Sequence, residues 1–406
     1  MRIVFINLHA DWMLVKTSSV MVYKFSPALK HGYLLNYLLS HPQEYEVCNY
    51  INDRGFSLFT KGSNALQKFL NLFSKLENRI ILGKNGIDRK KIKVITNSEE
   101  IRPDDIVIAY NFHHEHYRGL QNVKGFKALS FLHFHGKAEE DKLIKDAKVD
   151  CYFNEVNLYS TSELYRYFYH EEHPWIVIPF VFAQRFQNKK PFSERQNKAF
   201  SVGTITYKVH PEYFEVYKEG CLQPIRKLVK DFPEYYADTI DCYSEDYHEG
   251  DIGKKVTAKD HKIIALYKRI YNRFHNGRQK KYFSFDMVEK FNNYKMCIVG
   301  EERIGLPGIG FVEGMACGCA YLGIDSPMYR DYGLVPGVHY ISYDGTKEGL
   351  LKTIEYYQAL EHQEELERIA RTGCEFVRKN FRGDVVAEHL INELVHLRNE
   401  KLAKAK

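Results

Sequence analysis

A glycine-rich loop and a glutamate within residues 294–325 are the part of the sequence best suited to chemistry. The stretch reads YKMCIVGEERIGLPGIGFVEGMACGCAYLGID. An apolar run at Met296–Val299 predicts a strand, a loop with four glycines follows, and Glu313 begins a small-residue helix that ends at Gly318. Glycines let a backbone approach a ligand closely, and the start of a helix offers N–H groups to an anion. The pattern therefore predicts a site for a diphosphate.

Glu313 gives this loop a second function. A carboxylate does not face an anion, but it accepts hydrogen bonds from the two hydroxyls of a ribose. Backbone amides that bind phosphates, next to a carboxylate that binds a sugar, are suited to a nucleoside diphosphate. The alternative is that the glycines form only a tight strand-to-helix turn and that Glu313 is an ordinary charge. The spacing matches neither GxGxxG after the first strand nor GxxxxGK[ST], which disfavours the dinucleotide-binding and P-loop folds.

The elements around this loop predict an α/β protein with two domains. Short apolar runs alternate with stretches of helical period, which is typical of βα units around a parallel sheet. A polar segment at 185–198 lacks apolar periodicity and predicts a linker. The predicted domains are residues 1–185 and 199–380. A C-terminal segment at 381–406 contains an amphipathic helix, which we expect to pack back on the first domain.

The predicted strands fall into two groups. They lie at 3–7, 45–50, 106–110, 128–133, 151–154 and 176–180 in the first domain, and at 199–203, 238–243, 294–299, 320–323 and 339–342 in the second.

Composition and charge exclude several classes of protein. The 406 residues are 44% hydrophobic and 14% aromatic, which excludes a disordered chain. Residues 254–281 hold ten Lys or Arg and one Asp, so a local charge of +9 leaves −3 for the other 378 residues. Nucleic-acid recognition favours a broader basic surface, so we expect no nucleic-acid partner. No apolar run approaches the ~18 residues that cross a bilayer. With scattered cysteines and no signal peptide, this predicts a cytoplasmic protein.

Several segments resemble one known family. EGMACGCAYLG (313–323) is similar to the EAMACGxPVxA signature of retaining nucleotide-sugar glycosyltransferases of the GT-B fold, most closely family 4. The other segments, in family order, are DIVIAYNFHHEH (105–116) and LSFLHFHG (129–136), WIVIPFVFAQRF (175–186), FSVGTITYK (200–208), YGLVPGVHYISYD (332–344) and NFRGDVVAEHL (380–390). They resemble the family's histidine-ended strands, its "VIPNGVDxxxF" and "FVGRLxxxKG" segments, and its C-terminal motifs.

The resemblance implies a fold and an activity. In the GT-B fold, two Rossmann-like domains face each other across a cleft, and the first binds the acceptor while the second binds the donor. The implied enzyme moves a hexose-type sugar, with retention, from a UDP- or GDP-linked donor to a hydroxyl of a glycan or glycolipid. Surface polysaccharide biosynthesis is the implied setting. The nucleotide sugar is a substrate, and no cofactor is implied.

The family's donor-binding roles carry over to five residues. Glu313 matches the glutamate that binds the donor ribose. Gly308 and Gly310 lie in the loop whose amides face the donor sugar and diphosphate, and Gly203 matches the glycine-rich start of the second domain. Lys208 matches the lysine that pairs with the leaving diphosphate, where a point charge stabilises the developing negative charge.

The family's cleft histidine, which contacts the transferred sugar, corresponds to His135 or His133. The alternative is an ordinary histidine at a strand end. YKMCIVGEE…GFVEG also resembles the "YKFxxxFENS…YVTEK" pattern of inverting GT-B fucosyltransferases. An inverting enzyme needs a carboxylate base, and Glu115 beside the histidines is the candidate. A third alternative is a GT-B enzyme that does not transfer to an acceptor, such as an epimerase.

Two positions depart from the family pattern. Eight residues before the ribose glutamate the family has another glutamate, where this chain has Gly305. Glu301 or Glu302, in a longer loop, could contact the sugar instead. The arginine that opens the second domain in the family is Thr204 here, and Arg303 could supply the missing cation. No DxD motif occurs, so we expect cations and amides, rather than a metal ion, to bind the diphosphate.

The basic block predicts a helix over 258–275 with two faces. Apolar Ile263, Tyr267, Ile270 and Phe274 share one face, and Lys262, Arg269 and Arg273 share a neighbouring one. One interpretation is a solvated surface helix. The other is peripheral contact with the inner face of a membrane or with a lipid-linked acceptor, because basic amphipathic helices bind anionic interfaces.

Overall fold

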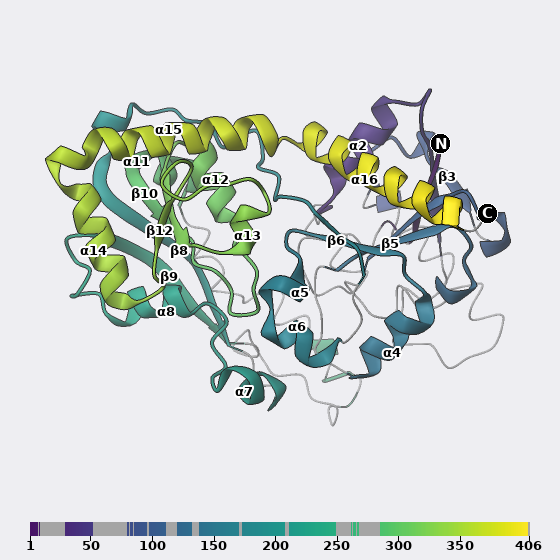
Figure 1. The fold of residues 1–406 in the computed structure, drawn as a ribbon, viewed down its shortest axis with the longest axis horizontal. Helices are drawn as coiled ribbons and strands as arrows, with labels where there is room; N and C mark the ends of the chain where they lie inside the picture. Colours follow the sequence, from purple (N-terminus) through teal and green to yellow (C-terminus); the bar gives the residue numbers. More distant parts are fainter. Residues whose placement is uncertain are drawn as a thin grey trace. The chain divides into compact units, whose positions relative to one another are not determined.

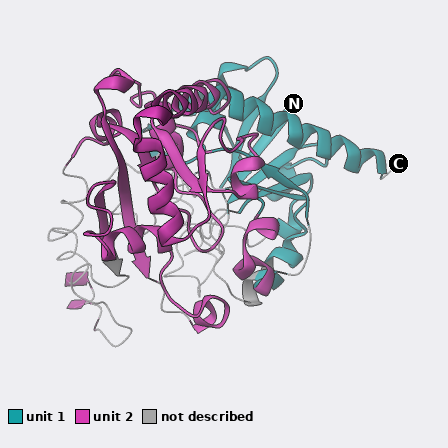
Figure 2. Ribbon diagram, turned by 60° about the vertical axis from the view of Figure 1, so that its left-hand side comes forward, with its two compact units in different colours: residues 1–157, 168–179, 383–406 teal, residues 158–167, 180–382 magenta. Residues whose placement is uncertain are grey.

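The computed structural model describes residues 1–6, 8, 29–51, 79–80, 82–83, 85–95, 97–110, 120–131, 138–169, 173–207, 211–248, 261, 263–264, 266–267 and 285–404. The chain divides into two compact units (Figure 2). Unit 1 consists of residues 1–157, 168–179 and 383–406, and unit 2 of residues 158–167 and 180–382.

The bounds of these units differ from the predicted domain bounds. The sequence analysis assigned residues 1–185 to one domain, whereas the contacts place 158–167 and the chain from Phe180 onward in unit 2. Two short helices, α5 (Leu158–Thr161) and α6 (Glu163–Phe168), cover this segment and the residue that follows it. The Leu164 amide donates to the Tyr217 hydroxyl at 3.2 Å, and Thr161 lies against Gly305. These contacts with residues distant in the sequence therefore place the segment in unit 2.

Unit 1 is built on a seven-stranded parallel sheet of order β3-β2-β1-β4-β5-β6-β7. The strands are β1 (Arg2–Ile6), β2 (Glu46–Tyr50), β3 (Lys93–Ile95), β4 (Ile106–Tyr110), β5 (Phe126–Ser130), β6 (Cys151–Asn154) and β7 (Trp175–Val177). Every residue of β1 and β4 is buried, as expected for continuous apolar runs in a parallel sheet covered on both faces. No apolar run predicted β3, because two of the three residues of this edge strand are exposed.

Helices α2 (Gly32–Ser40), α4 (Ala138–Ala147) and α16 (Gly383–Lys404) complete unit 1. Helix α16, yellow in Figure 1, packs against α2. The leucines that α2 buries are Leu34, Leu35 and Leu38, and α16 buries an apolar stripe from Val386 to Leu394. The last residues of the chain therefore complete the core of the first unit.

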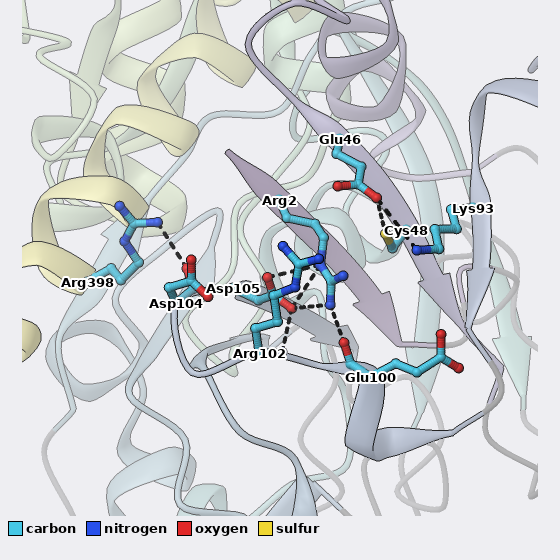
Figure 3. A network of polar contacts seen from close by, with 9 residues as sticks. All are labelled: Arg2, Glu46, Cys48, Lys93, Glu100, Arg102, Asp104, Asp105 and Arg398. Carbon is cyan, nitrogen blue, oxygen red and sulfur yellow. Dashed lines mark hydrogen bonds and ion pairs between the residues drawn. The ribbon is translucent and has the colours of Figure 1, made fainter.

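A polar network fixes the amino ends of β1 and β4 (Figure 3). Arg2 donates from Nε to both oxygens of Asp105, at 3.0 and 3.1 Å, and from Nη2 to Oδ2 at 2.7 Å. The Arg102 amide also donates to Asp105 Oδ2, at 2.8 Å. Both charged side chains are buried, so the carboxylate is held by the full set of donors that a buried charge requires. Arg398 of α16 donates to the Asp104 carbonyl at 3.1 Å.

Unit 2 is built on a five-stranded parallel sheet of order β12-β11-β10-β8-β9. The strands are β8 (Gln196–Tyr207), β9 (Ile240–His248), β10 (Tyr294–Ile298), β11 (Ala320–Ile324) and β12 (Ile341–Tyr343). The helices around it are α7 (Pro211–Tyr217), α8 (Pro224–Asp231), α11 (Met287–Asn293), α12 (Gly310–Ala316), α13 (Pro327–Arg330), α14 (Lys347–Gln358) and α15 (Gln363–Asn380). One buried cluster joins residues of α8, α14 and α15 to β10 and β11.

The polar segment predicted as a linker is held firmly to unit 2. Arg195 is 4% exposed and donates from Nη2 to the carbonyls of Cys317 and Lys190 at 2.9 and 3.0 Å. It also donates to Asn188 Oδ1 at 2.6 Å. Within 185–198, Phe186 and Arg195 are buried, while the other residues are half-buried or exposed. Among the described helices, none is long and apolar enough to cross a membrane.

Candidate functional site

The candidate site lies at the carboxyl ends of β8 and β10. These neighbouring strands run in parallel, with Met296 opposite Ala199 and Ile298 opposite Ser201. After β8 the chain forms β9 on one side, and then crosses to form β10 on the other. The crevice at such a reversal of strand order is where open parallel sheets bind ligands. The glycines predicted to approach a ligand lie here.

Two of these glycines surround the guanidinium of Arg226. A Cβ on Gly203, whose φ is +138°, would lie 2.5 Å from Arg226 Cζ. A Cβ on Gly308 would lie 2.7 Å from Val299 Cγ1 and 2.8 Å from Arg226 Nη2. The structure therefore brings Gly203 and Gly308 together, around a side chain that the sequence analysis did not select. The three atoms nearest to a Cβ on Gly310 all belong to Val299, with Cγ2 at 3.0 Å, so this glycine lets α12 pack closely on the end of β10.

Arg226 projects from α8 and is 7% exposed. Its Nη1 donates to the Thr204 carbonyl at 2.8 Å, and its Nε donates to the Val299 carbonyl. Thr204 belongs to β8 and Val299 follows β10, so the guanidinium bridges the crevice between the two strands. No motif marks Arg226; the one signal is a charged residue between the buried Ile225 and Val229 of an amphipathic helix.

Glu313 lies in the first turn of α12, which follows the glycine loop. Its side chain is half-buried, and burial raises the pKa of Glu313 to about 7, while the nearby Arg185 lowers it. Hydrogen-bond donors stabilise a carboxylate that is partly withdrawn from water. Hydroxyl groups of a bound ligand would supply them.

The raised pKa of Glu313 predicts a pH-dependent stability. The usual pKa is 4.5, so between pH 4.5 and about 7 the folded protein holds a proton that the unfolded chain releases. Stability therefore falls as the pH rises through this window. Relative to Glu313→Gln, the wild-type protein should lose about 2 kcal/mol of unfolding free energy between the two ends of the window. Urea denaturation across the range measures the difference, and parallel curves for the two proteins would contradict the burial of a charge.

Glu301 and Glu302 have different environments. Glu301 is 6% exposed and accepts hydrogen bonds from the Tyr329 hydroxyl at 2.7 Å and the Ile324 amide at 3.1 Å. It is thus a buried link between β10 and the following strand, and does not fit the predicted contact with a sugar. Glu302 is half-buried and accepts from Gln223 Nε2 at 3.2 Å. Arg303, the predicted substitute cation, forms an ion pair with Glu219.

Gly305 occupies a position that no other residue fits well. Its φ is +81°, and an added Cβ would lie 2.3 Å from the carbonyl oxygen of Thr161. A left-handed φ is costly for a residue with a Cβ, and the backbone of α5 fills the space that a side chain would need. The departure from the family glutamate at this position therefore has a structural reason.

The remaining predicted site residues, Lys208, Glu115, His133 and His135, lie outside the described residues. The described carboxyl edge of the unit 1 sheet carries other polar groups. Asn154 ends β6 with 0% exposure, and neither its Oδ1 nor its Nδ2 has a hydrogen-bond partner in the described part of the chain. Within those same described ranges, no three His, Cys, Asp or Glu side chains are grouped to hold a metal ion.

Comparisons with known proteins identify the fold. No protein-family model matches the chain, and no curated protein sequence matches it. HepE from Anabaena, solved in complex with UDP, is similar in structure, with a TM-score of 0.50 and 10% identity over 98% of this chain and 100% of that chain. Sucrose-phosphate synthase from Thermosynechococcus elongatus follows with a TM-score of 0.47 and 11% identity over 100% of both chains. With the two parallel sheets, the HepE likeness confirms the predicted fold class, α/β with two Rossmann-like domains of the GT-B type.

Proposed function

We propose that the protein is a nucleotide-sugar glycosyltransferase whose donor binds in unit 2. The observation that carries this proposal is the crevice between β8 and β10, where two glycines line the Arg226 guanidinium and the glycine loop leads to the half-buried Glu313 carboxylate. A cation for phosphates and a carboxylate for ribose hydroxyls are the two groups that a nucleoside diphosphate needs. HepE, which shares the fold, was solved with UDP bound.

The donor and the acceptor are the only reactants in the proposed reaction. The bond between the sugar C1 and the diphosphate oxygen breaks, and a bond forms between C1 and the acceptor oxygen. In the retaining version, the leaving diphosphate takes the acceptor's proton. Cationic side chains stabilise the negative charge that develops on the leaving group. The proposal includes likeness to family 4, transfer with retention, a glycan or glycolipid as the acceptor, and independence of metal ions.

Peripheral membrane contact through residues 258–275 is a further part of the proposal. The described apolar residues of this block are well exposed, at 71% for Ile263, 56% for Leu266 and 54% for Tyr267. Exposed apolar side chains within a strongly basic segment suit an anionic interface at the cytoplasmic face. Co-sedimentation with vesicles of anionic and of neutral lipid tests this contact.

A binding screen tests the donor assignment. Thermal-shift measurements with UDP, GDP, CMP and ADP sugars should reveal stabilisation by one nucleotide class, because a ligand that binds only the folded state raises its apparent stability. Slow hydrolysis of that donor without an acceptor would then indicate a transferase. No shift with any nucleotide sugar would remove the proposed function.

The Glu313→Ala variant tests the carboxylate directly. Loss of hydrogen bonds to a charged group should lower the affinity for the bound nucleotide about 10- to 100-fold. The affinity for the corresponding nucleoside should fall by the same factor, since the contact is with the ribose. Calorimetric titration measures both. Glu289→Ala, an exposed glutamate of α11, is the matched control and should bind as the wild type does. Unchanged affinity in Glu313→Ala would exclude the ribose contact.

A further inference from the structure

The chain that follows β7 lies against the end of helix α12, and Arg378 of α15 joins the two. Arg378 Nη2 donates to the Phe186 carbonyl at 2.9 Å and to the Ala316 carbonyl at 2.7 Å. Ala316 is the last residue of α12, and Glu313 lies three residues before it, on a neighbouring position of the helix surface. Arg185, which precedes Phe186, therefore lies beside the part of α12 that carries Glu313.

The guanidinium of Arg185 is open to solvent. Arg185 is exposed, and its Cζ lies 4.7 Å from the centroid of the Phe186 ring, which is itself buried and supports the guanidinium. Within the described ranges of the chain, Arg185 has no hydrogen bond and no ion pair. Its charge nevertheless acts on Glu313, because Arg185 lowers the pKa that burial raises. An exposed cation near this carboxylate therefore has its N–H groups available to a ligand.

The groups of the proposed donor site follow one another along α12. The glycine loop precedes the helix, Glu313 lies in its first turn, and the segment that carries Arg185 meets its end. A nucleotide has the same order of parts, since its ribose lies between the phosphates and the base. With the diphosphate at the glycine loop and the ribose hydroxyls on Glu313, the base continues toward Arg185.

The chemistry of arginine then discriminates among bases. An arginine side chain offers N–H donors and no acceptor. Uracil and guanine present a carbonyl oxygen where cytosine and adenine present an amino group. We infer that Arg185 binds the base of the donor and selects uracil or guanine over cytosine and adenine. This inference rests on the proposed function, and it names the residue that determines the class of nucleotide.

The experiment compares nucleotides that differ in this group of the base. Calorimetric titration gives the affinity for UDP against CDP, and for GDP and IDP against ADP, in the wild type, Arg185→Ala and Arg185→Lys. IDP is included because its base has the carbonyl of guanine without the amino group. The wild type should bind the carbonyl-bearing nucleotide about 10- to 100-fold more tightly, which is the effect of a hydrogen bond to a charged group. Arg185→Ala should lose most of this preference, and Arg185→Lys, which also has donors only, should retain part of it.

The matched control is Arg371→Ala, because Arg371 is also an exposed arginine of unit 2, on α15. Its affinities should equal those of the wild type. A preference that is absent from the wild type, or that persists in Arg185→Ala, would overturn the inference. A lower affinity of Arg185→Ala for the diphosphate with an unchanged affinity for the nucleoside would overturn it too, since the contact would then be with the phosphates. Should the wild type bind none of these diphosphates, the proposed function itself fails, and the inference fails with it.

Discussion

Alanine at Gly305 should lower the free energy of unfolding by about 4 kcal/mol. The residue has φ of +81°, a conformation that costs a residue with a Cβ about 1–2 kcal/mol. The new Cβ would also lie 2.3 Å from the carbonyl oxygen of Thr161 and 2.7 Å from its carbon. Both are backbone atoms, so α5 or the loop after β10 must move. Urea denaturation gives the change in free energy.

Gly337→Ala separates the two contributions. Gly337 belongs to the same unit and has a similar φ of +73°, but an added Cβ would meet no atom within 4 Å. This variant should lose only the backbone contribution, about 1 kcal/mol. Equal losses at both positions would show that Thr161 does not limit the space at Gly305. Gly305→Glu, which restores the family residue, should be destabilised at least as much as Gly305→Ala.

Removing the Asp105 carboxylate should cost about 4 kcal/mol, because it leaves the guanidinium of Arg2 buried without its counter-ion. Arg2 and Asp105 are 7% and 1% exposed and are joined by three hydrogen bonds of 2.7 to 3.1 Å. Their link fixes the amino ends of β1 and β4, which pair through Ile3 and Ile106 in the middle of the unit 1 sheet. The Asp105→Ala variant should therefore unfold at a clearly lower urea concentration.

Asp104→Ala is the control for this substitution. Asp104 is exposed, and its contact with Arg398 uses the backbone carbonyl, which alanine retains. Its unfolding free energy should stay within about 0.5 kcal/mol of the wild type. If Asp105→Ala were as stable as Asp104→Ala, the network in Figure 3 would contribute little to the fold.

The sequence by itself determined the fold class and the location of the candidate site. Continuous apolar runs such as those of β1 and β4 predict strands buried on both faces of a parallel sheet, and the structure confirms them. The glycine loop and Glu313 were recognisable because turn chemistry and helix starts are local features, set by neighbouring residues. Gly203 and Gly308 were both predicted as site residues, and both lie against the guanidinium of Arg226.

The tertiary structure decided which side chains fill that site. Arg226 reaches carbonyls 22 and 73 residues away along the chain, and no local pattern records such partners. Glu301 and Glu302 are adjacent residues of the same type, yet only Glu301 is buried and hydrogen-bonded to Tyr329. Thr161 fills the space beside Gly305 that a side chain would need, and it is distant from Gly305 in the sequence. Periodicity reports which face of an element is buried, whereas the partner of a buried polar group depends on the elements packed beside it.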